Sequence, residues 1–343
     1  MKKIVSCFLA LITAFSLFSC AKTNPEPQKR YFWGYFNSSN SEMLSVLSDY
    51  SGLGKKEFDA LSERFEKELR EYHRLYDIYH NYDGINNLKT VNDNAGNGKI
   101  KVDQKIIELL LFGKEMYVFT NGNVNIAMGA VLKIWHDYRA AGASVPSMAE
   151  LQEANKHTNI NDIVIDAENL TVEILDPKLQ IDVGAIAKGY AVEMICEALR
   201  EDGYTALTAD VGGNLKALGA KPNGDGWLTG IKNPSPTPEN RYIYTFELKN
   251  AATVTSGNYE NNYEVDGRLY HHIISPKTLM PSDYYSSVSI ITSSSALADA
   301  LSTAIFNMEP SEAKSFIESK KGLKVVALTT DGNLEIWEGV PHK

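Results

Sequence analysis

The amino-acid sequence predicts an α+β fold in which helices pack on one or more largely antiparallel sheets. Helical patterns come mostly early in the chain, whereas short strand patterns dominate after residue 205. Asn-Gly, Asp-Gly and Ser-Gly turns separate several of these strands, and connections of hairpin length favour antiparallel pairing over a doubly wound fold. The 343-residue chain is long enough for a large core, built as a single large domain of two interlocked lobes.

The first nineteen residues predict a targeting segment. Lys2 and Lys3 precede an apolar run at residues 4–18, which is too short for a comfortable membrane span. Ser19 before Cys20 is typical of a bacterial lipoprotein cleavage site, so we expect residues 1–19 to be removed and Cys20 to be acylated. The alternative is an ordinary signal peptide with an incidental cysteine. Residues 20–30 are polar with two prolines and predict a tether, which leaves 31–343 as the folded domain.

The helices and strands are expected in the following order. An aromatic-rich first strand is expected at 31–36, and an apolar stripe that includes Phe58, Leu61 and Phe65 predicts a helix over 55–82. Further helices are expected at 102–120 (opened by Asp103), 126–141, 147–156, 184–201, 294–307 and 311–320. Strands are expected in a hairpin at 163–175 and at 206–211, 227–232, 242–248, 252–255, 263–265, 269–274, 286–291, 324–329 and 334–337.

Charge and cysteine content exclude some function classes. The formal net charge is −9, so the chain lacks the basic surface that nucleic-acid binding requires. Cys196 lies in a helical pattern between apolar residues and is expected to be a buried thiol. No internal disulfide is expected if Cys20 is acylated.

The segment 296–304 carries a carboxylate and a hydroxyl among small and apolar residues. Asp299 and Thr303 are four residues apart, so both side chains project from one face of a helix. With no basic residue nearby on that helix, the two oxygens suggest ligands for Mg²⁺, which usually serves phosphate chemistry. The alternative is structural, because a threonine hydroxyl often bonds back to a helical carbonyl.

Three other segments suggest ligand contacts. Asp182 and Lys188 lie in a glycine-containing turn that opens a helix, where amide groups and a lysine attract anions. Residues 209–214 end a strand with two glycines that permit close backbone approach. His271 and His272 point to opposite faces of a strand, so one of them could be a general base. The alternatives are an N-cap aspartate with a surface lysine, a tight turn, and a structural histidine.

Five stretches, in this order, resemble the FAD:protein FMN transferases, the ApbE-type flavin transferases. They are residues 182–191, 211–214 with 227–231, 255–259, 272–278 and 298–303, and a weaker match runs from Asn125 to Trp135. Within them, Ser275 and Leu279 replace the family's usual Asp and Gly, and Asn125-Ile126-Ala127 replaces an Asp-x-Thr pattern.

The resemblance implies roles for individual residues. Asp299 and Thr303 match Mg²⁺ ligands, and Ala185 matches a position whose backbone carbonyl completes the site. Asp182, Lys188 and either His272 or Ile273 match FAD-contacting positions; Asn92 ends a stretch that resembles an early substrate-binding segment, and the loop from Asn123 to Asn125 resembles one near the adenosine end.

The expected activity is Mg²⁺-dependent transfer of the FMN moiety of FAD to a Thr or Ser hydroxyl of an acceptor protein, with release of AMP. His272 would accept the proton of the acceptor hydroxyl, and Lys188 would stabilise phosphate charge. One alternative is an FAD pyrophosphatase that uses water as the acceptor. The other is a non-catalytic flavin-binding lipoprotein, which the departures at Ala127, Ser275 and Leu279 favour. An exported, membrane-anchored protein would meet its acceptor on the periplasmic side.

Overall fold

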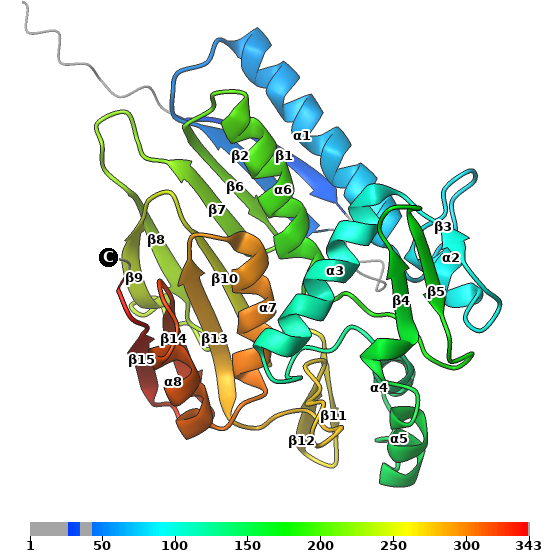
Figure 1. Ribbon diagram of the computed structural model, residues 1–343. Coiled ribbons are helices and arrows are strands. Elements are labelled where there is room, and N and C mark those ends of the chain that lie inside the picture. Colours follow the sequence, from blue (N-terminus) through cyan, green and yellow to red (C-terminus); the bar gives the residue numbers. More distant parts are fainter. Residues whose placement is uncertain (1–26, 35–42, 342–343) are drawn as a thin grey trace, which may run out of the picture.

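The centre of the molecule is one eight-stranded antiparallel sheet, which confirms the predicted fold class (Figure 1). The computed structural model describes residues 27–34 and 43–341, so the predictions for residues 1–19 and Cys20 lie outside the described residues. In spatial order the strands are β1 (Gln28–Gly34), β2 (Met43–Asp49), β6 (Ala206–Val211), β7 (Asn214–Gly219), β10 (Ala252–Gly257), β13 (Tyr285–Thr292), β14 (Lys324–Thr329) and β15 (Leu334–Glu338).

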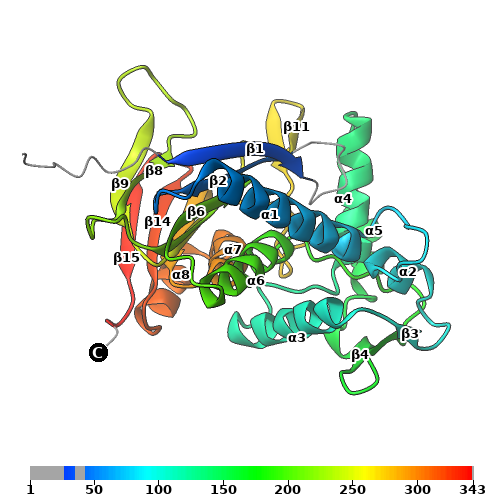
Figure 2. The same ribbon diagram turned by 90° about the horizontal axis from the view of Figure 1, so that it is seen from above.

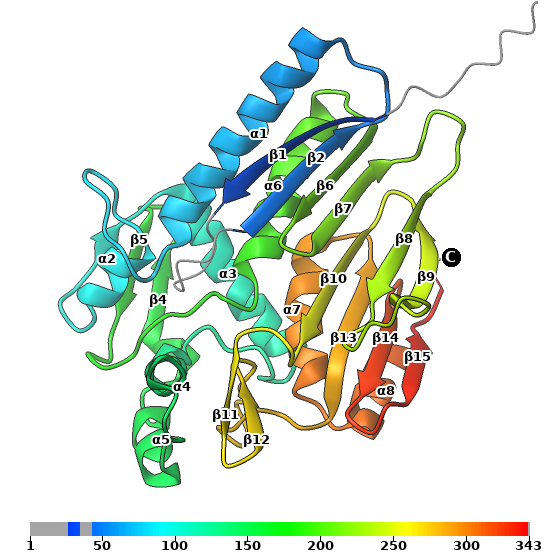
Figure 3. The same ribbon diagram turned by 180° about the vertical axis from the view of Figure 1, so that it is seen from behind.

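Helices cover one face of this sheet and a hairpin covers part of the other. The helices are α1 (Lys55–Tyr76), α6 (Ala187–Glu201), α7 (Ser295–Phe306) and α8 (Pro310–Glu318). Seen from behind, the strands lie in front of α6 and α7 (Figure 3). The hairpin of β8 (Trp227–Lys232) and β9 (Tyr242–Leu248) packs a small separate cluster against the sheet, including Trp227, Leu248 and Ala217.

A second lobe lies beside the helical layer (Figure 2). It contains α2 (Leu88–Asp93), α3 (Gln104–Phe119), α4 (Gly129–Ala141), α5 (Met148–Asn155), a short 3₁₀ turn (Ile160–Asp162), the sheet β3 (Ile100–Lys101), β5 (Thr171–Ile174) and β4 (Ile163–Asp166), and the hairpin β11 (Asn262–Val265) and β12 (Arg268–His271). One continuous apolar core joins both lobes, from Leu110 of α3 through Ile186 to Leu301 of α7 and Ile290 of β13. The two lobes therefore form a single domain.

Several predicted boundaries are wrong at their ends. Strand β1 begins at Gln28, so the last residues of the predicted tether belong to the sheet, and residues 35–36 lie outside the described part. The helix expected over 55–82 ends at Tyr76, because the Asp77 carboxylate accepts the backbone N–H of Tyr79 and of His80 and the hydroxyl hydrogen of Tyr82. These bonds hold the next residues in a turn.

Local signals predicted other elements correctly. Asp103 is the N-cap of α3 and accepts the N–H of Lys105 at 2.8 Å. Cys196 is a buried free thiol, and burial raises its pKa to about 12.

Within residues 27–34 and 43–341, none of the helices has the length and apolar character needed to cross a membrane.

Candidate functional site

A cavity of about 760 Å³ forms where the ends of several elements meet, and it is large enough for a sizeable small-molecule ligand. Its walls come from the C-terminal end of α1, the start of α6, one face of α4, the β6–β7 turn and the segment after β12. Eight of the residues singled out from the sequence line it: Asn123, Asn125, Asp182, Ala185, Lys188, His272, Ile273 and Thr303. The fold thus brings together residues up to 180 positions apart in the chain.

Asp182 lies in a turn that leads into α6. Its backbone N–H donates to the carbonyl of Ile126 at 2.8 Å, and its Oδ1 accepts the N–H of Gly184 at 2.8 Å. The N-cap of α6 is Ile186, with no side-chain cap, so the alternative reading of Asp182 as that cap is wrong. Burial raises the pKa of the Asp182 carboxyl. Lys188 follows in the first turn of α6 and also lines the cavity.

Asn92 is not among the residues that line the cavity. Its side-chain amide donates to the Ile181 carbonyl at 2.9 Å and its Oδ1 accepts the Ile181 N–H at 2.7 Å. Asn92 therefore fixes the backbone directly before Asp182, and direct contact with FAD stays a prediction. Asn123 has a clearer relation to a ligand: it is 1% exposed, lines the cavity, and its Oδ1 has no hydrogen-bond partner among the described residues.

Asp299 lies on α7 against the start of α6 and is 4% exposed. Its Oδ2 accepts the N–H of Gly189 at 2.8 Å, and in the described part of the chain its Oδ1 accepts no hydrogen bond. Burial raises the pKa of Asp299 to about 6, although the charge of Lys188 and the Gly189 N–H oppose that shift. A buried carboxylate with one unbonded oxygen favours a bound cation, because the cation compensates the buried negative charge. The nearby lysine favours an anionic group, which the same cation can bridge to the carboxylate.

The hydroxyl of Thr303 is not used inside the helix. Ser302, not Thr303, bonds back to the Asp299 carbonyl, at 2.9 Å, and among the described residues the Thr303 hydroxyl makes no hydrogen bond. The structural alternative for Thr303 is therefore not supported. The Asp299 carboxylate, the Thr303 hydroxyl and the Ala185 carbonyl are all hard oxygen donors, the kind that small divalent cations prefer. Ala185 and Thr303 line the cavity, whereas Asp299 is not among its lining residues.

Only one of these three donors is a carboxylate. Across the residues that the structure describes, no group of three or more His, Cys, Asp or Glu side chains could hold a metal ion. Sites with one carboxylate are typical of cations that keep water ligands and take further oxygens from substrate phosphates. The cavity beside Thr303 and Ala185 gives such a phosphate a place to bind.

The two histidines have different environments, but the prediction that both lie on a strand is wrong: β12 ends at His271, and His272 lies in the bend that follows. His271 is 3% exposed, and its Nε2 lies 2.8 Å from the Ser282 carbonyl while its Nδ1 accepts the Ile273 N–H. His272 faces the cavity, with Nδ1 3.2 Å from the Glu260 carbonyl. A carbonyl only accepts, so Nδ1 of His272 carries the hydrogen and Nε2 keeps a free lone pair.

We expect His272 to remain neutral well into the acid range. Burial lowers its pKa to about 4, assisted by His271, Arg139 and Lys188. The unfolded chain would take up this proton near pH 6.5, so the neutral ring contributes stability above that pH that is lost as the pH falls towards 4. An NMR titration of the imidazole, assigned with His272→Gln, should give an apparent pKa below 5; titration near 6.5 would contradict the buried environment.

Two of the three departures from the family pattern, Ser275 and Leu279, lie in a defined turn after His272. Leu279 has φ +61°, a left-handed conformation that favours glycine, and its carbonyl accepts the Nε1–H of Trp135 at 2.9 Å. Its buried side chain offsets the conformational cost, since burial of a leucine is worth about 2 kcal/mol. The Ser275 hydroxyl accepts the N–H of Lys277 at 3.3 Å. Serine therefore still organises the turn.

Sequence reasoning missed part of the cavity wall. His73, Tyr79, His136 and Arg139 all line it, from α1, the turn after it and α4. The only signal for them was the helical period of the two segments, which does not distinguish a core face from a ligand face.

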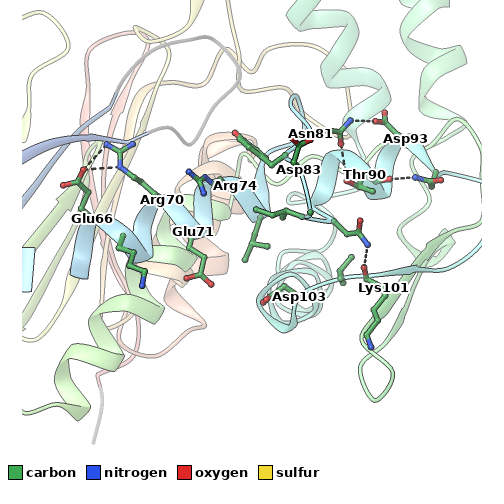
Figure 4. A pocket seen from close by; sticks show the side chains of 18 of the residues that line it. Glu66, Arg70, Glu71, Arg74, Asn81, Asp83, Thr90, Asp93, Lys101 and Asp103 are labelled. Carbon is green, nitrogen blue, oxygen red and sulfur yellow. Dashed lines mark hydrogen bonds and ion pairs between the residues drawn. The ribbon is translucent and has the colours of Figure 1, made fainter. Parts of the chain in front are cut away.

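A second, larger hollow of about 1270 Å³ lies along the outer face of α1, the turn at 81–86 and α2 (Figure 4). None of the candidate site residues predicted from the sequence lines it. Its side chains bond largely to one another, for example Arg70 to Glu66 and Asn81 to Asp93. The smaller cavity is therefore the candidate functional site.

Comparisons with known proteins agree with this fold and identify a family. Residues 44–327 match a family model described as the ApbE family. FAD:protein FMN transferase of Treponema pallidum (strain Nichols) is 31% identical over 271 residues, covering 74% of this chain and 73% of that protein. The Escherichia coli K12 protein of the same name is 23% identical and covers 95% of this chain and 93% of its own.

Solved structures show the same fold. The crystal structure of the ApbE protein from Thermotoga maritima superposes with a TM-score of 0.77 and 26% identity, covering 91% of this chain and 97% of that one. Flavin transferase ApbE from Vibrio cholerae, at 21% identity, has a TM-score of 0.73 with the same coverage and supports the fold alone.

Proposed function

The chain belongs to the ApbE family, and on that basis we infer that it is an FAD:protein FMN transferase, an enzyme that moves the FMN moiety of FAD to an acceptor protein. One structural observation links this inferred function to the candidate site. Asp182, Lys188, His272 and Thr303 line one cavity, and buried Asp299 directs a hydrogen-bonded oxygen to Gly189 while its other oxygen is unbonded in the described chain. The cavity volume of about 760 Å³ suits a dinucleotide that is partly exposed.

We propose that Asp299, Thr303 and the Ala185 carbonyl hold Mg²⁺. When bound there, Mg²⁺ neutralises pyrophosphate charge and polarises phosphorus. The chain's own residues supply the rest: the Gly189 N–H orients the Asp299 carboxylate, and Lys188 adds positive charge at the start of α6, where helix amides also favour phosphate.

The proposed reaction transfers a phosphoryl group to a Thr or Ser hydroxyl of the acceptor. A bond forms between the hydroxyl oxygen and the FMN phosphorus, the bond from that phosphorus to the bridging oxygen breaks, and AMP leaves with the bridging oxygen. The hydroxyl proton passes to Nε2 of His272, the ring nitrogen that is left free when Nδ1 donates to the Glu260 carbonyl. Positioning and electrostatics carry most of such a reaction.

The test is the product formed with and without an acceptor. Purified protein is incubated with FAD, Mg²⁺ and a co-expressed candidate acceptor from the same cell, and the intact mass of the acceptor is measured. We expect a gain equal to FMN less water and an equal amount of AMP. Rapid release of free FMN and AMP without acceptor would favour the pyrophosphatase; tight FAD binding with no AMP would favour the non-catalytic alternative.

We also propose that the protein is a lipoprotein anchored through Cys20 and facing the periplasm. The support is the N-terminal pattern itself and the short distance along the chain from Cys20 to Gln28, where β1 begins. That stretch spans at most about 30 Å when fully extended, so acceptors would be proteins close to the membrane surface. Mass spectrometry of the N-terminal peptide tests this: acylated Cys20 is expected, and an unmodified N-terminus elsewhere would contradict it.

A further inference from the structure

A buried ion pair lies close to the candidate metal ligands and takes no part in the proposed reaction. Lys216 of β7 is 3% exposed and Glu193 of α6 is 9% exposed. The Lys216 Nζ donates to Glu193 Oε1 at 2.9 Å, to Oε2 at 3.1 Å and to the Ser293 carbonyl at 2.6 Å. Neither side chain lines the cavity.

Glu193 and Asp299 make two reciprocal bonds between α6 and α7. Asp299 of α7 accepts the backbone N–H of Gly189 on α6, and Glu193 of α6 accepts the backbone N–H of Ser295 on α7. Glu193 lies one turn after Gly189, and Ser295 lies one turn before Asp299. The same two turns therefore carry both bonds, one at the candidate metal ligand and one at the ion pair.

Helices α6 and α7 pack very closely at Gly189, so the distance between them there cannot be shorter. A Cβ built on Gly189 would lie 2.4 Å from the Ser295 carbonyl oxygen and 2.4 Å from the Asp299 Cβ. Lys216 adds a third element, since it neutralises Glu193 and holds the carbonyl of Ser293 just before the N-cap Ser294. The ion pair therefore determines where α7 begins relative to α6 and β7.

We propose that Glu193 and Lys216 are positioning residues for the metal site: they fix the first turn of α7 against α6 so that Asp299 is presented in register with Thr303 and Ala185. The inference rests on the proposed metal site. Its physical reason is that a ligand carboxylate must be held to within about 0.5 Å by partners that are themselves fixed. Gly189 orients one oxygen of Asp299, and the ion pair fixes the helix that carries it.

The test compares two double variants that leave no unpaired buried charge. Glu193→Ala with Lys216→Met removes the acceptor of the Ser295 N–H, whereas Glu193→Gln with Lys216→Met keeps an acceptor oxygen there. Mn²⁺ binding to each protein is measured by electron paramagnetic resonance of the free ion, with Asp299→Ala as the reference lacking the site. We expect the Ala-containing variant to bind Mn²⁺ about 10–100-fold more weakly than wild type. The Gln-containing variant keeps the acceptor for the Ser295 N–H but lacks the Lys216 bond to the Ser293 carbonyl, so its binding should weaken less, by about 3–10-fold.

Hydrogen exchange provides a readout that a general loss of stability would not reproduce. The Gly189 amide should exchange faster in the Ala-containing variant than in the Gln-containing one, relative to amides of the distant strand β14. If that variant does not fold, Glu193→Asp, which keeps the charge but withdraws the carboxylate from Ser295, is measured in the same way and should also bind Mn²⁺ more weakly.

The outcomes separate this inference from the metal site itself. Wild-type protein that binds no more Mn²⁺ than Asp299→Ala would overturn both. Wild-type binding that persists unchanged in the Ala-containing variant, or in Glu193→Asp, with an unchanged Gly189 exchange rate, would overturn the positioning role alone.

Discussion

Asp299→Asn should lower the rate of AMP release from FAD by at least about 10³-fold, which corresponds to about 4 kcal/mol of transition-state stabilisation. The asparagine oxygen can still accept the Gly189 N–H, so the α6–α7 contact is kept. The substitution removes the negative charge one helical turn before Thr303. It also removes the unbonded Oδ1, the oxygen atom that we propose binds Mg²⁺. The measurement is AMP formation over a Mg²⁺ titration, with circular dichroism to confirm folding.

Asp59→Asn is the matched control for this substitution. Asp59 is an exposed carboxylate in α1 that pairs with Lys55 one turn away, and such a pair is worth only about 0.3–0.5 kcal/mol. We expect wild-type AMP release from it. Asp299→Asn protein that retained Mg²⁺-dependent activity within tenfold of wild type would be incompatible with the proposed site.

Gly189→Ala should destabilise the native state by about 2–4 kcal/mol and weaken metal binding together. The added methyl group would lie 2.4 Å from the Ser295 carbonyl oxygen and from the Asp299 Cβ, distances that real Cβ atoms essentially never show. To relieve this steric overlap, α7 must move away from α6, and Asp299 moves with it. Urea unfolding measures the stability change as a lower midpoint at an unchanged slope.

The control for crowding is Gly54→Ala. Gly54 precedes α1, has φ −61°, and a Cβ there would meet nothing within 4 Å. Alanine is a poorer N-cap than glycine but restricts the unfolded chain more, so these effects oppose each other and the free energy of unfolding should change by less than about 1 kcal/mol. A Gly189→Ala protein as stable as the Gly54→Ala protein would show that the helices separate easily and that the crossing is not tight.

The sequence predicted the elements whose side chains follow a regular apolar period. Phe58, Leu61, Phe65 and Leu69 are all buried along α1, as the stripe required. Strands β2 and β7 escaped prediction because polar residues occupy their buried positions. Ser45 is fully buried on β2 while Leu44 beside it is exposed, and Lys216 is buried on β7. Lys216 is tolerated only because Glu193, on a different element, pairs with it.

In the candidate site, too, local patterns could be predicted from the sequence and long-range contacts could not. The four-residue spacing of Asp299 and Thr303 correctly placed both side chains on one helix face, since spacing is a local property. The bond from Gly189 to Asp299 joins residues 110 positions apart, and no local pattern encodes it. The function of Asn92 as a clamp on Ile181 likewise depends on a partner 89 positions away. Contacts of that kind come only from the packed fold.

We propose that a divalent cation binds between Asp299, Thr303 and the carbonyl of Ala185, beside the cavity that is proposed to take FAD. Crystals grown with Mn²⁺ and FAD test it most directly through anomalous diffraction at the manganese edge. We expect one strong anomalous peak within coordination distance of Asp299 Oδ1 and the Thr303 hydroxyl. Well-defined FAD in the cavity with no anomalous peak beside Asp299 would contradict it.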